Sequence, residues 1–501
     1  MNKCTKANKM NAYEELVKIS RKIHNLEHMS SIVGWDQQTM MPQGSNDARS
    51  NALAEFDVLL HQISTDAKAA ELIKQASTQE LTKIEKASLL EIKREYELHT
   101  ILPDELVKAK SLAGSKCEYS WREQRENNDW KGFLVNFEEV VNLSRQEASI
   151  RAEHTGLSPY DSLLNIYEPD MNSKLLDDIF FDVKSWLPSL ISEIVDKQKN
   201  ESILKPTGTF SIKQQKDLGL SVMKKLGFDF DKGRLDVSAH PFCGGVCEDV
   251  RITTRYDEKD FIQSLMGIVH ETGHALYEQN LPSSLSFLPV GKARSMGIHE
   301  SQSLLFEMQM GRGRAFLESI RQNVVDAFGS SDVFCIDNLV KIYSEVKPGL
   351  IRVDADEVTY PAHVILRYEI EKDLMNGVIE AKDIPDMWNE KMKLYLGLDT
   401  RGNFKDGPMQ DVHWTDGSFG YFPSYTLGAM YAAQQFKTVE TLYPNVNENI
   451  SKGDYFQVVS WLKENIWQKA SLLSTTDLIK EATGESLNPK YLKQHLEQRY
   501  L

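Results

Sequence analysis

Hydrophobic positions recur at helical spacing through the first two hundred residues of the chain. Tyr13, Leu16 and Ile19 follow one another three residues apart, and the alternation typical of strands is nearly absent there. The segment 81–101 interleaves apolar residues with Glu and Lys, which is the pattern of an amphipathic helix, and Pro103 marks its end. The first part of the chain is therefore predicted to be a succession of helices.

Two later stretches depart from this pattern. Glycine and proline cluster after Asn200, which predicts loops or a change of architecture. Residues 249–256 then alternate between apolar and polar side chains and form the clearest strand of the chain. This strand leads into an apolar, helix-periodic stretch from Phe261 to Leu276. We expect a free strand edge that binds an extended peptide, or else a face of structural ion pairs.

Composition supports long, uninterrupted elements. Among 501 residues there are 28 glycines and 16 prolines, below the usual abundance of roughly 7 % and 5 %. Hydrophobic residues make up 41 % and charged residues 26 %, enough for a sizeable core. Length alone suggests three average domains, although one large helical body of this size is possible.

Charge and cysteine content narrow the class of partner and the compartment. Lys and Arg number 58 against 73 Asp and Glu, a net charge of −15, which argues against binding to nucleic acid or anionic membranes. The five cysteines are an odd number and fit a reducing compartment. Cys243 and Cys247 lack the second pair of a zinc knuckle. With no apolar leader or membrane-spanning run, the expected location is cytoplasmic.

The apolar stretch contains the motif His270-Glu271-Thr272-Gly273-His274, which matches HExxH. Positions four apart lie on one helix face, so both imidazoles can reach one ion, and Glu271 lies beside them as a base for zinc-activated water. A chance match on a helix surface is the alternative. Gly267 and Gly273 are costly inside a helix, which predicts a close-packed neighbour at each.

A catalytic zinc ion also needs a third protein ligand. Glu300 lies far enough beyond His274 to begin a second helix and is the preferred candidate. The alternatives are His299, which points elsewhere on that helix, and Glu278, which shares the His274 face. Glu307 shares the Glu300 face and suits the role of holding a ligating histidine.

Several motifs in order resemble the carboxypeptidase Taq family of zinc metallocarboxypeptidases. The resemblance covers nearly the whole chain. It rests on Gly34–Pro42, His240-Pro241-Phe242, Asp249 with Arg251 and Thr253, His270–His274, His299–Ser303, Ile351-Arg352 with Ala355-Asp356, and Gly407 with Gln410-Asp411 and His413-Trp414.

This resemblance implies a mainly α-helical fold, one large body with a deep substrate groove. The strand predicted at 249–256 adds a small β element beside the HExxH helix. The resemblance implies one peptidase unit over 1–501, in which 1–200 form a helical wall of the groove and 201–501 carry the metal site and substrate-binding segments. It also implies a homodimer, and one Zn²⁺ per chain held by His270, His274 and Glu300, with Glu271 as general base. Co²⁺ or Mn²⁺ may substitute for zinc.

A carboxypeptidase must recognise the terminal carboxylate of its substrate, which a guanidinium binds through two parallel hydrogen bonds. Arg352 is the candidate for this role, and an ion pair with Asp356 four residues later is the alternative. By resemblance, the blocked end of the groove is shaped by Gln410, Asp411, His413 and Trp414. Burial in the core is the alternative for Trp414, and a hydrogen bond to a buried acceptor is the alternative for His413.

The segment Gly417–Gly428 mixes glycine with aromatic residues and predicts a mobile loop that closes over substrate. Tyr425, or else Tyr421, is expected to donate to the oxyanion of the transition state, with ordinary packing as the alternative for each. His240 is a further candidate for contact with substrate. Arg251 is assigned to substrate binding and Asp249 to the surroundings of the metal site.

The sequence thus predicts a metallocarboxypeptidase that releases C-terminal amino acids from peptides with broad specificity. One alternative is a zinc oligopeptidase that cleaves internal bonds. An alternative of another class is an inactive helical binding or scaffold protein.

Overall fold

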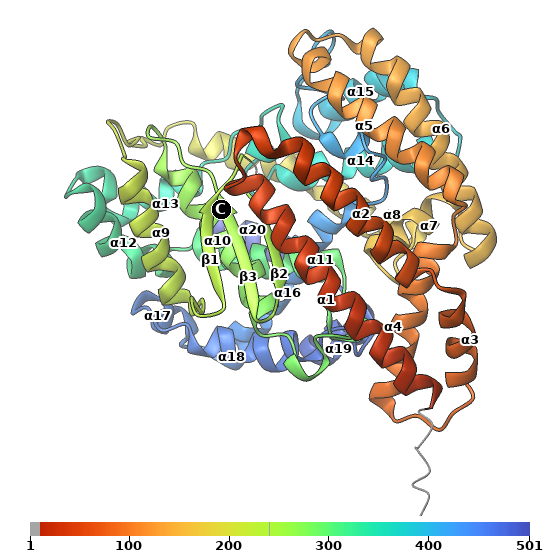
Figure 1. Ribbon diagram of the computed structural model, residues 1–501. Helices are drawn as coiled ribbons and strands as arrows, with labels where there is room; N and C mark the ends of the chain where they lie inside the picture. Colours follow the sequence, from red (N-terminus) through yellow and green to blue (C-terminus); the bar gives the residue numbers. More distant parts are fainter. Residues whose placement is uncertain (1–10, 240) are drawn as a thin grey trace, which may run out of the picture.

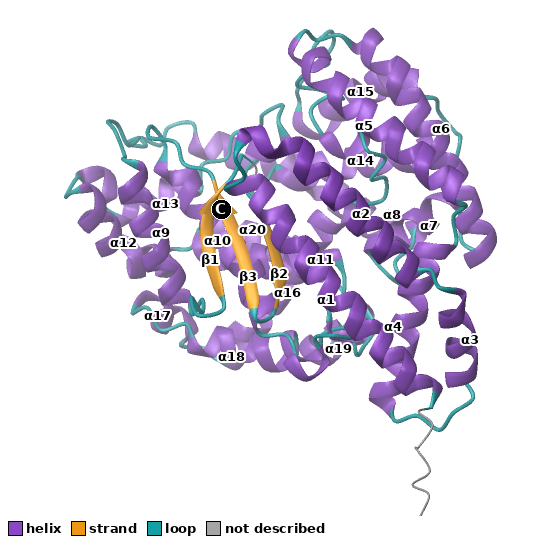
Figure 2. Cartoon of the chain, in the orientation of Figure 1, coloured by secondary structure: helices purple, strands orange, loops and turns teal. Residues whose placement is uncertain are grey.

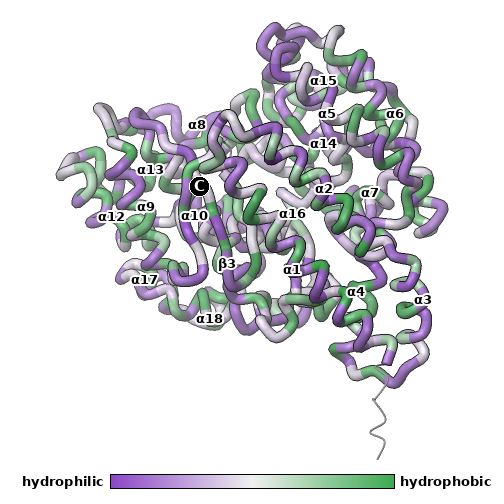
Figure 3. The backbone as a smooth tube through the Cα atoms, viewed as in Figure 1, coloured by the Kyte–Doolittle hydropathy of each residue, from purple (hydrophilic) through white to green (hydrophobic). Residues whose placement is uncertain are grey.

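Helices account for most of the chain in the computed structural model, which describes residues 11–239 and 241–501 (Figures 1 and 2). The prediction of a mainly helical body with a small β element next to the HExxH helix is confirmed. Hydrophobic and hydrophilic positions alternate along the helices, as Figure 3 shows. In the described part of the chain, no helix is both long and apolar enough to cross a bilayer.

The first four helices form a unit that we call the N-terminal arm. They are α1 (Ala12–Thr39), α2 (Asn46–Ser64), α3 (Ala67–Ala76) and α4 (Lys83–Thr100). Seven buried residues of α1, α3 and α4 form a hydrophobic cluster with Leu288 and Val290, which is separate from the main core. The amphipathic helix expected over 81–101 is confirmed, since α4 ends just before Pro103.

The main core begins with the helices that follow the arm. These are α5 (Asp104–Glu126), α6 (Trp130–Thr155), α7 (Pro159–Tyr167), α8 (Ser173–Gln198) and α9 (Ile212–Leu226). The core runs from Ala113 to Tyr500, so it joins residues from both ends of the chain. In Figure 1, α5 and α6 lie beside α14 and α15, and α6 contacts α14 directly.

The change of architecture expected after Asn200 is a three-stranded sheet. Its strands are β1 (Gly233–Val237), β2 (Cys243–Val246) and β3 (Asp249–Thr254), in the order β1-β3-β2. The central strand β3 pairs with β1 in parallel and with β2 in antiparallel orientation. The strand expected over 249–256 is therefore present but shorter, and the expectation that it has a free edge is wrong.

Three helical segments meet where the HExxH motif lies. They are α10 (Phe261–Gln279), α11 (Met296–Leu304) with the π-helical segment Leu305–Gly311, and α16 (Pro423–Leu442). A Cβ on Gly273 would lie 2.6 Å from the Gln302 carbonyl oxygen, so the expected close neighbour exists there. At Gly267 the expectation is wrong, because no atom lies within 4 Å of such a Cβ.

The remaining helices complete the body around these segments. They are α12 (Arg314–Phe328), α13 (Ile336–Tyr343), α14 (Tyr360–Met375), α15 (Ile384–Leu396), α17 (Val446–Ser451), α18 (Phe456–Asn465), α19 (Thr475–Thr483) and α20 (Lys490–Tyr500). The loop expected over Gly417–Gly428 is only half correct. Pro423 begins α16 and its fixed φ suits the first helical turn, so Tyr425 lies on a helix.

Candidate metal centre and substrate site

Two neighbouring helices bring three potential metal ligands together. His270 and His274 lie one turn apart on α10, and Glu300 lies on α11. One ligand atom from each side chain lies within 4.8 Å of the others. The Nε2 atom of His274 is 3.4 Å from a Glu300 carboxylate oxygen. Two imidazoles and one carboxylate are a donor set that suits a catalytic zinc site.

Glycine allows α16 to approach the helix that carries Glu300. A Cβ on Gly428 would lie only 2.7 Å from Cγ of Glu300 and 2.8 Å from its Cβ. Any larger residue at this position would push the two helices apart. The position of Glu300 therefore depends on Gly428 as well as on α11.

His270 is oriented by a carboxylate from the π-helical segment. Its Nδ1 atom is 2.9 Å from a carboxylate oxygen of Glu307. The other oxygen of Glu307 accepts a hydrogen bond of 2.7 Å from Arg312. Glu307 thus lies where the sequence predicted, and its contact leaves Nε2 of His270 free to face the ligand cluster.

Glu278 and His299, the rejected candidates for the third ligand, contact each other instead. His299 Nδ1 is 2.6 Å from His274 Nδ1, and His299 Nε2 is 2.8 Å from a Glu278 carboxylate oxygen. Neither belongs to the group of three potential ligands found among the described residues. The contacts therefore run from His274 to His299 and on to Glu278, outside the group of three potential ligands.

Glu271 is buried beside the ligands, and its Oε2 atom has no hydrogen-bond partner. Burial raises the pKa of Glu271 to about 7, a shift that His270 opposes and Glu300 reinforces. A carboxylate with a pKa near neutrality is suited to accept and release protons in the physiological range.

The electrostatic field of the cluster favours a cation. Burial lowers the pKa of His270, but the carboxylates of Glu307, Glu300 and Glu271 outweigh burial and raise this pKa to about 10. By contrast, burial and the neighbouring His299 lower the pKa of His274 to about 4. The residues present therefore fit a divalent cation by donor type, by spacing and by the sign of the field.

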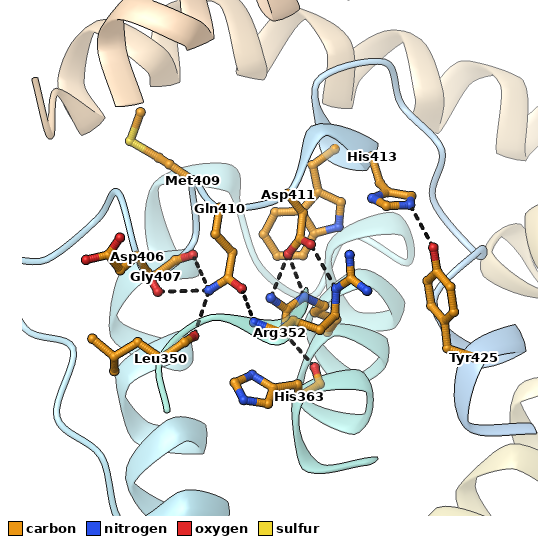
Figure 4. Close-up of polar contacts among 12 residues, drawn as sticks. Leu350, Arg352, His363, Asp406, Gly407, Met409, Gln410, Asp411, His413 and Tyr425 are labelled. Carbon is orange, nitrogen blue, oxygen red and sulfur yellow. Dashed lines mark hydrogen bonds and ion pairs between the residues drawn. The ribbon is translucent and has the colours of Figure 1, made fainter. Parts of the chain in front are cut away.

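Figure 4 shows the second group of predicted site residues, around Arg352. The buried guanidinium of Arg352 donates through Nε to Asp411 at 2.9 Å and through Nη1 to the Tyr360 hydroxyl at 2.9 Å. Gln410 accepts a hydrogen bond from the Arg352 backbone nitrogen at 2.8 Å. The alternative ion pair with Asp356 is wrong, because Arg352 lies in a 3-10 turn where helical spacing does not apply.

Two arginines share one carboxylate in this group. Arg367 donates to the second oxygen of Asp411 at 2.7 Å and is fully buried. Burial and the arginines lower the pKa of His413 to about 4 and that of His363 to about 3, so both histidines are neutral. Arg352, Arg367 and Asp411 together therefore carry one positive charge in excess.

The two candidate tyrosines lie against this group. The Tyr425 hydroxyl is 3.2 Å from Nε2 of His413, and its ring centre is 5.0 Å from the Arg352 guanidinium. The rings of Tyr421 and Tyr425 are 5.3 Å apart. Burial raises the pKa of both phenols, and Glu300 adds to this shift, which places both rings within the field of the metal cluster.

Trp414 and the last turns before α16 are held by a buried acid. The Trp414 indole nitrogen donates to Glu371 at 2.7 Å, and Gly420 donates its backbone N–H to the same carboxylate at 3.0 Å. Trp414 is 1 % exposed, as its core alternative predicted. Trp414 therefore affects the site only indirectly, by holding the backbone of the neighbouring His413.

Asp249 and Arg251 lie on the sheet and contact the N-terminal arm. They form a two-bond ion pair of 2.8 and 2.9 Å, and His28 of α1 lies 3.3 Å from Asp249. The guanidinium of Arg251 lies 4.4 Å from the Trp35 ring centre. These contacts match the ion-pair alternative for this strand. His240, the remaining candidate, lies outside the described residues.

Sequence reasoning missed Arg367 and Glu371. Both lie on α14, where His363, Arg367 and Glu371 follow one another every four residues and are flanked by Val364, Ile365, Leu366 and Ile370. Polar residues at helical spacing among apolar residues predict a buried polar stripe that needs partners. That signal was available in the sequence, although the partners Asp411 and Trp414 were not.

Comparisons with known proteins give one consistent result. A family model described as carboxypeptidase Taq (M32) metallopeptidase matches residues 15–500. The chain is 35 % identical over 500 residues to carboxypeptidase 1 of Bacillus subtilis, and the match covers 98 % of both chains. It is 34 % identical over 501 residues to thermostable carboxypeptidase 1 of Thermus thermophilus, again covering 98 % of each. The solved structure of Trypanosoma cruzi metallocarboxypeptidase 1 matches with a TM-score of 0.96 and 48 % identity, covering 98 % of this chain and 99 % of that one.

Proposed function

Because the chain belongs to the carboxypeptidase Taq (M32) family and is a metallocarboxypeptidase that releases C-terminal residues, we propose that His270, His274 and Glu300 hold its catalytic metal ion. The observation that carries the proposal is their convergence within 4.8 Å beside the unpartnered, buried carboxylate of Glu271. The donor set favours one Zn²⁺ per chain, for which Co²⁺ or Mn²⁺ can substitute.

When bound, the cation supplies Lewis-acid chemistry that polarises the scissile carbonyl and lowers the pKa of the attacking water. Glu271 takes a proton from that water and passes it to the nitrogen of the leaving amino acid. Tyr425 donates a hydrogen bond through its hydroxyl to the developing oxyanion, and its neighbour His413 holds the phenol in place through the 3.2 Å contact.

Arg352 binds the terminal carboxylate of the peptide in this proposal. The excess positive charge of Arg352, Arg367 and Asp411 supports the assignment, since a substrate carboxylate neutralises it. Asp411 and Gln410 fix the guanidinium and backbone of Arg352. His240, Arg251 and Tyr421 remain candidates for contact with more distant parts of a peptide, and Asp249 supports Arg251 through the ion pair.

Further parts of the proposal concern the whole molecule. We treat 1–501 as one peptidase unit, which is supported by the core running from Ala113 to Tyr500 and by the packing of the N-terminal arm against Leu288 and Val290. Helix α2 has no buried residue and exposes Val58 and Leu59, which supports an interface of a homodimer on this side. A cytoplasmic location is supported by the unpaired cysteines at 117, 243, 247 and 335.

Hydrolysis of matched peptides by the Glu271→Gln variant tests the proposal. The wild-type chain should release single residues from a free-acid peptide, stall on its C-amidated twin and lose activity with a chelator. Glu271→Gln should retain one metal ion per chain and lose at least about 10³-fold in kcat, because the neutral amide cannot accept the proton. Lys382→Gln, on an exposed turn, is the control with unchanged activity.

Two results would contradict this proposal. Near wild-type turnover by Glu271→Gln would remove Glu271 from the proton transfers. Equal cleavage of the free-acid and amidated peptides, with internal fragments as products, would favour the oligopeptidase alternative over terminal recognition by Arg352.

A further inference from the structure

The two histidine ligands are supported in different ways. Nδ1 of His270 contacts a carboxylate directly, at 2.9 Å from Glu307. Nδ1 of His274 contacts a second histidine, His299, at 2.6 Å, and only that histidine reaches a carboxylate, Glu278, at 2.8 Å. The chain of contacts from His274 through His299 to Glu278 has no role in the mechanism above.

Hydrogen-bond chemistry permits a single proton arrangement that leaves His274 able to bind a cation. A carboxylate oxygen accepts, so Nε2 of His299 carries a proton and donates it to Glu278. In a neutral imidazole the other nitrogen is then a lone-pair acceptor. Nδ1 of His299 must therefore accept the proton of His274 Nδ1, because the two nitrogens are only 2.6 Å apart.

This arrangement leaves the lone pair of His274 on Nε2. That atom faces Glu300 at 3.4 Å and belongs to the ligand cluster. In the opposite arrangement, His299 Nδ1 would donate to His274, and the proton of His274 would be on Nε2, where it blocks coordination. Which nitrogen of His274 carries the proton is therefore decided at His299.

The geometry also fixes the ring of His299 in place. Its centroid is 4.6 Å from that of His274 and 5.5 Å from that of Tyr277. Tyr277 is fully buried, and its hydroxyl accepts a hydrogen bond from the Arg294 backbone nitrogen at 3.3 Å. His299 thus packs against two rings of α10 while both of its nitrogens are engaged.

We propose that His299 and Glu278 are positioning residues that hold His274 in the tautomer with a free Nε2 and thereby set the affinity of the site for its metal. This inference rests on the proposed role of His274 as a ligand. His299 acts as a hydrogen-bond acceptor for His274, and Glu278 keeps His299 in the accepting tautomer. Partners of ligating histidines typically contribute about 10–100-fold to metal affinity.

Two substitutions of nearly equal shape separate this role from packing. Asparagine places an acceptor oxygen near the position of Nδ1, whereas leucine offers none. Metal affinity is measured at one fixed pH by titrating the metal-free protein with Zn²⁺ against a chromophoric chelator. His299→Leu should weaken Zn²⁺ binding by about 10–100-fold, and His299→Asn should stay within about threefold of wild type. The melting temperatures of the two metal-free variants should be equal.

Two variants of Glu278 and one variant each of His154 and His274 complete the experiment. Glu278→Met should weaken Zn²⁺ binding, and Glu278→Gln, which keeps an acceptor oxygen, should largely restore it. His154→Asn alters a half-exposed histidine of α6 and should leave affinity unchanged. His274→Ala tests the ligand assignment itself: if it binds Zn²⁺ like wild type, the proposed metal site fails. If it loses Zn²⁺ but His299→Leu and His299→Asn bind alike, the positioning role fails and the metal site stands.

Discussion

At the scale of single residues, the carboxylate of Asp411 is the counter-charge of two buried arginines. It accepts hydrogen bonds of 2.9 Å from Arg352 and 2.7 Å from Arg367. All three side chains are buried, so removal of the carboxylate leaves two guanidinium groups without a counter-charge. A broken buried pair of this kind costs about 3–5 kcal/mol of folding free energy.

Asp411→Asn should therefore destabilise the protein by about 3–5 kcal/mol at neutral pH and raise KM for free-acid peptides. The arginines hold the pKa of Asp411 well below its ordinary value of 3.8. The stabilisation is therefore complete above the unfolded pKa and is lost as pH falls through the folded one. Urea unfolding should give a constant difference between the variants above about pH 5 and a shrinking one below about pH 4. A difference that does not change with pH would contradict this account.

For the same residues, the sequence predicted the role of Arg352 but not its ion-pair partner. Arg352 was identified because binding a carboxylate requires a guanidinium, and the alternative was an ion pair with Asp356, four residues away. The observed partner, Asp411, lies 59 residues on. Spacing along the chain indicates neighbours only inside a regular helix, and Arg352 lies in a 3-10 turn.

At the scale of elements, glycine determines how closely helices pack around the three candidate metal ligands. Gly273 and Gly267 both lie in α10, six residues apart, and looked equivalent in the sequence. A Cβ at Gly273 would meet Ser303 Cα of α11 at 2.7 Å, whereas at Gly267 it would meet nothing within 4 Å. The two positions therefore form a matched pair for substitution.

Gly273→Ala should lower the free energy of unfolding by about 1–3 kcal/mol and weaken metal binding, because α11 must move away with Glu300. Gly267→Ala should leave metal binding unchanged and raise the free energy of unfolding by up to about 1 kcal/mol, the helix-propensity gain of alanine. Thermal unfolding of the metal-free variants and zinc titration measure both effects. Equal stability changes in the two variants would show that the close approach of α11 is unimportant.

Elements whose pattern is local were predicted well. The HExxH helix and the candidate ligand pair His270 and His274 depend on periodicity within one helix. Helix α10 begins at Phe261 as expected and ends at Gln279, three residues beyond the expected Leu276. The free edge of the strand at 249–254 was wrong because its neighbours β1 and β2 are irregular in composition and were not identified as strands. Tyr425 was placed in a loop because the glycines near it outweighed the helix-starting signal of Pro423.

At the scale of the whole molecule, the N-terminal arm contacts the body at the sheet and at the segment around Leu288 and Val290. Its hydrophobic cluster is separate from the main core. Trp35 of α1 packs against two arginines of the sheet, with the guanidinium of Arg234 at 4.7 Å and that of Arg251 at 4.4 Å from its ring centre. Asp236 and Asp249 pair with these arginines, so the indole contacts a fixed pair of cations.

Trp35→Leu should therefore loosen the arm and leave the core intact. Cation–π contacts contribute about 0.5–2 kcal/mol each, and leucine retains apolar volume without the π-face. Hydrogen exchange measured by mass spectrometry should become faster in residues 12–39, while exchange in α10 stays at the wild-type rate. Trp35→Phe keeps a π-face, and its exchange rate in residues 12–39 should lie between those of the wild type and Trp35→Leu.

If α10 and α1 lose protection equally in Trp35→Leu, the arm and the core unfold as one cooperative unit. Because Arg251 and Asp249 belong to the motif shared with the carboxypeptidase Taq family, local loosening alone would identify that motif as an attachment for the arm.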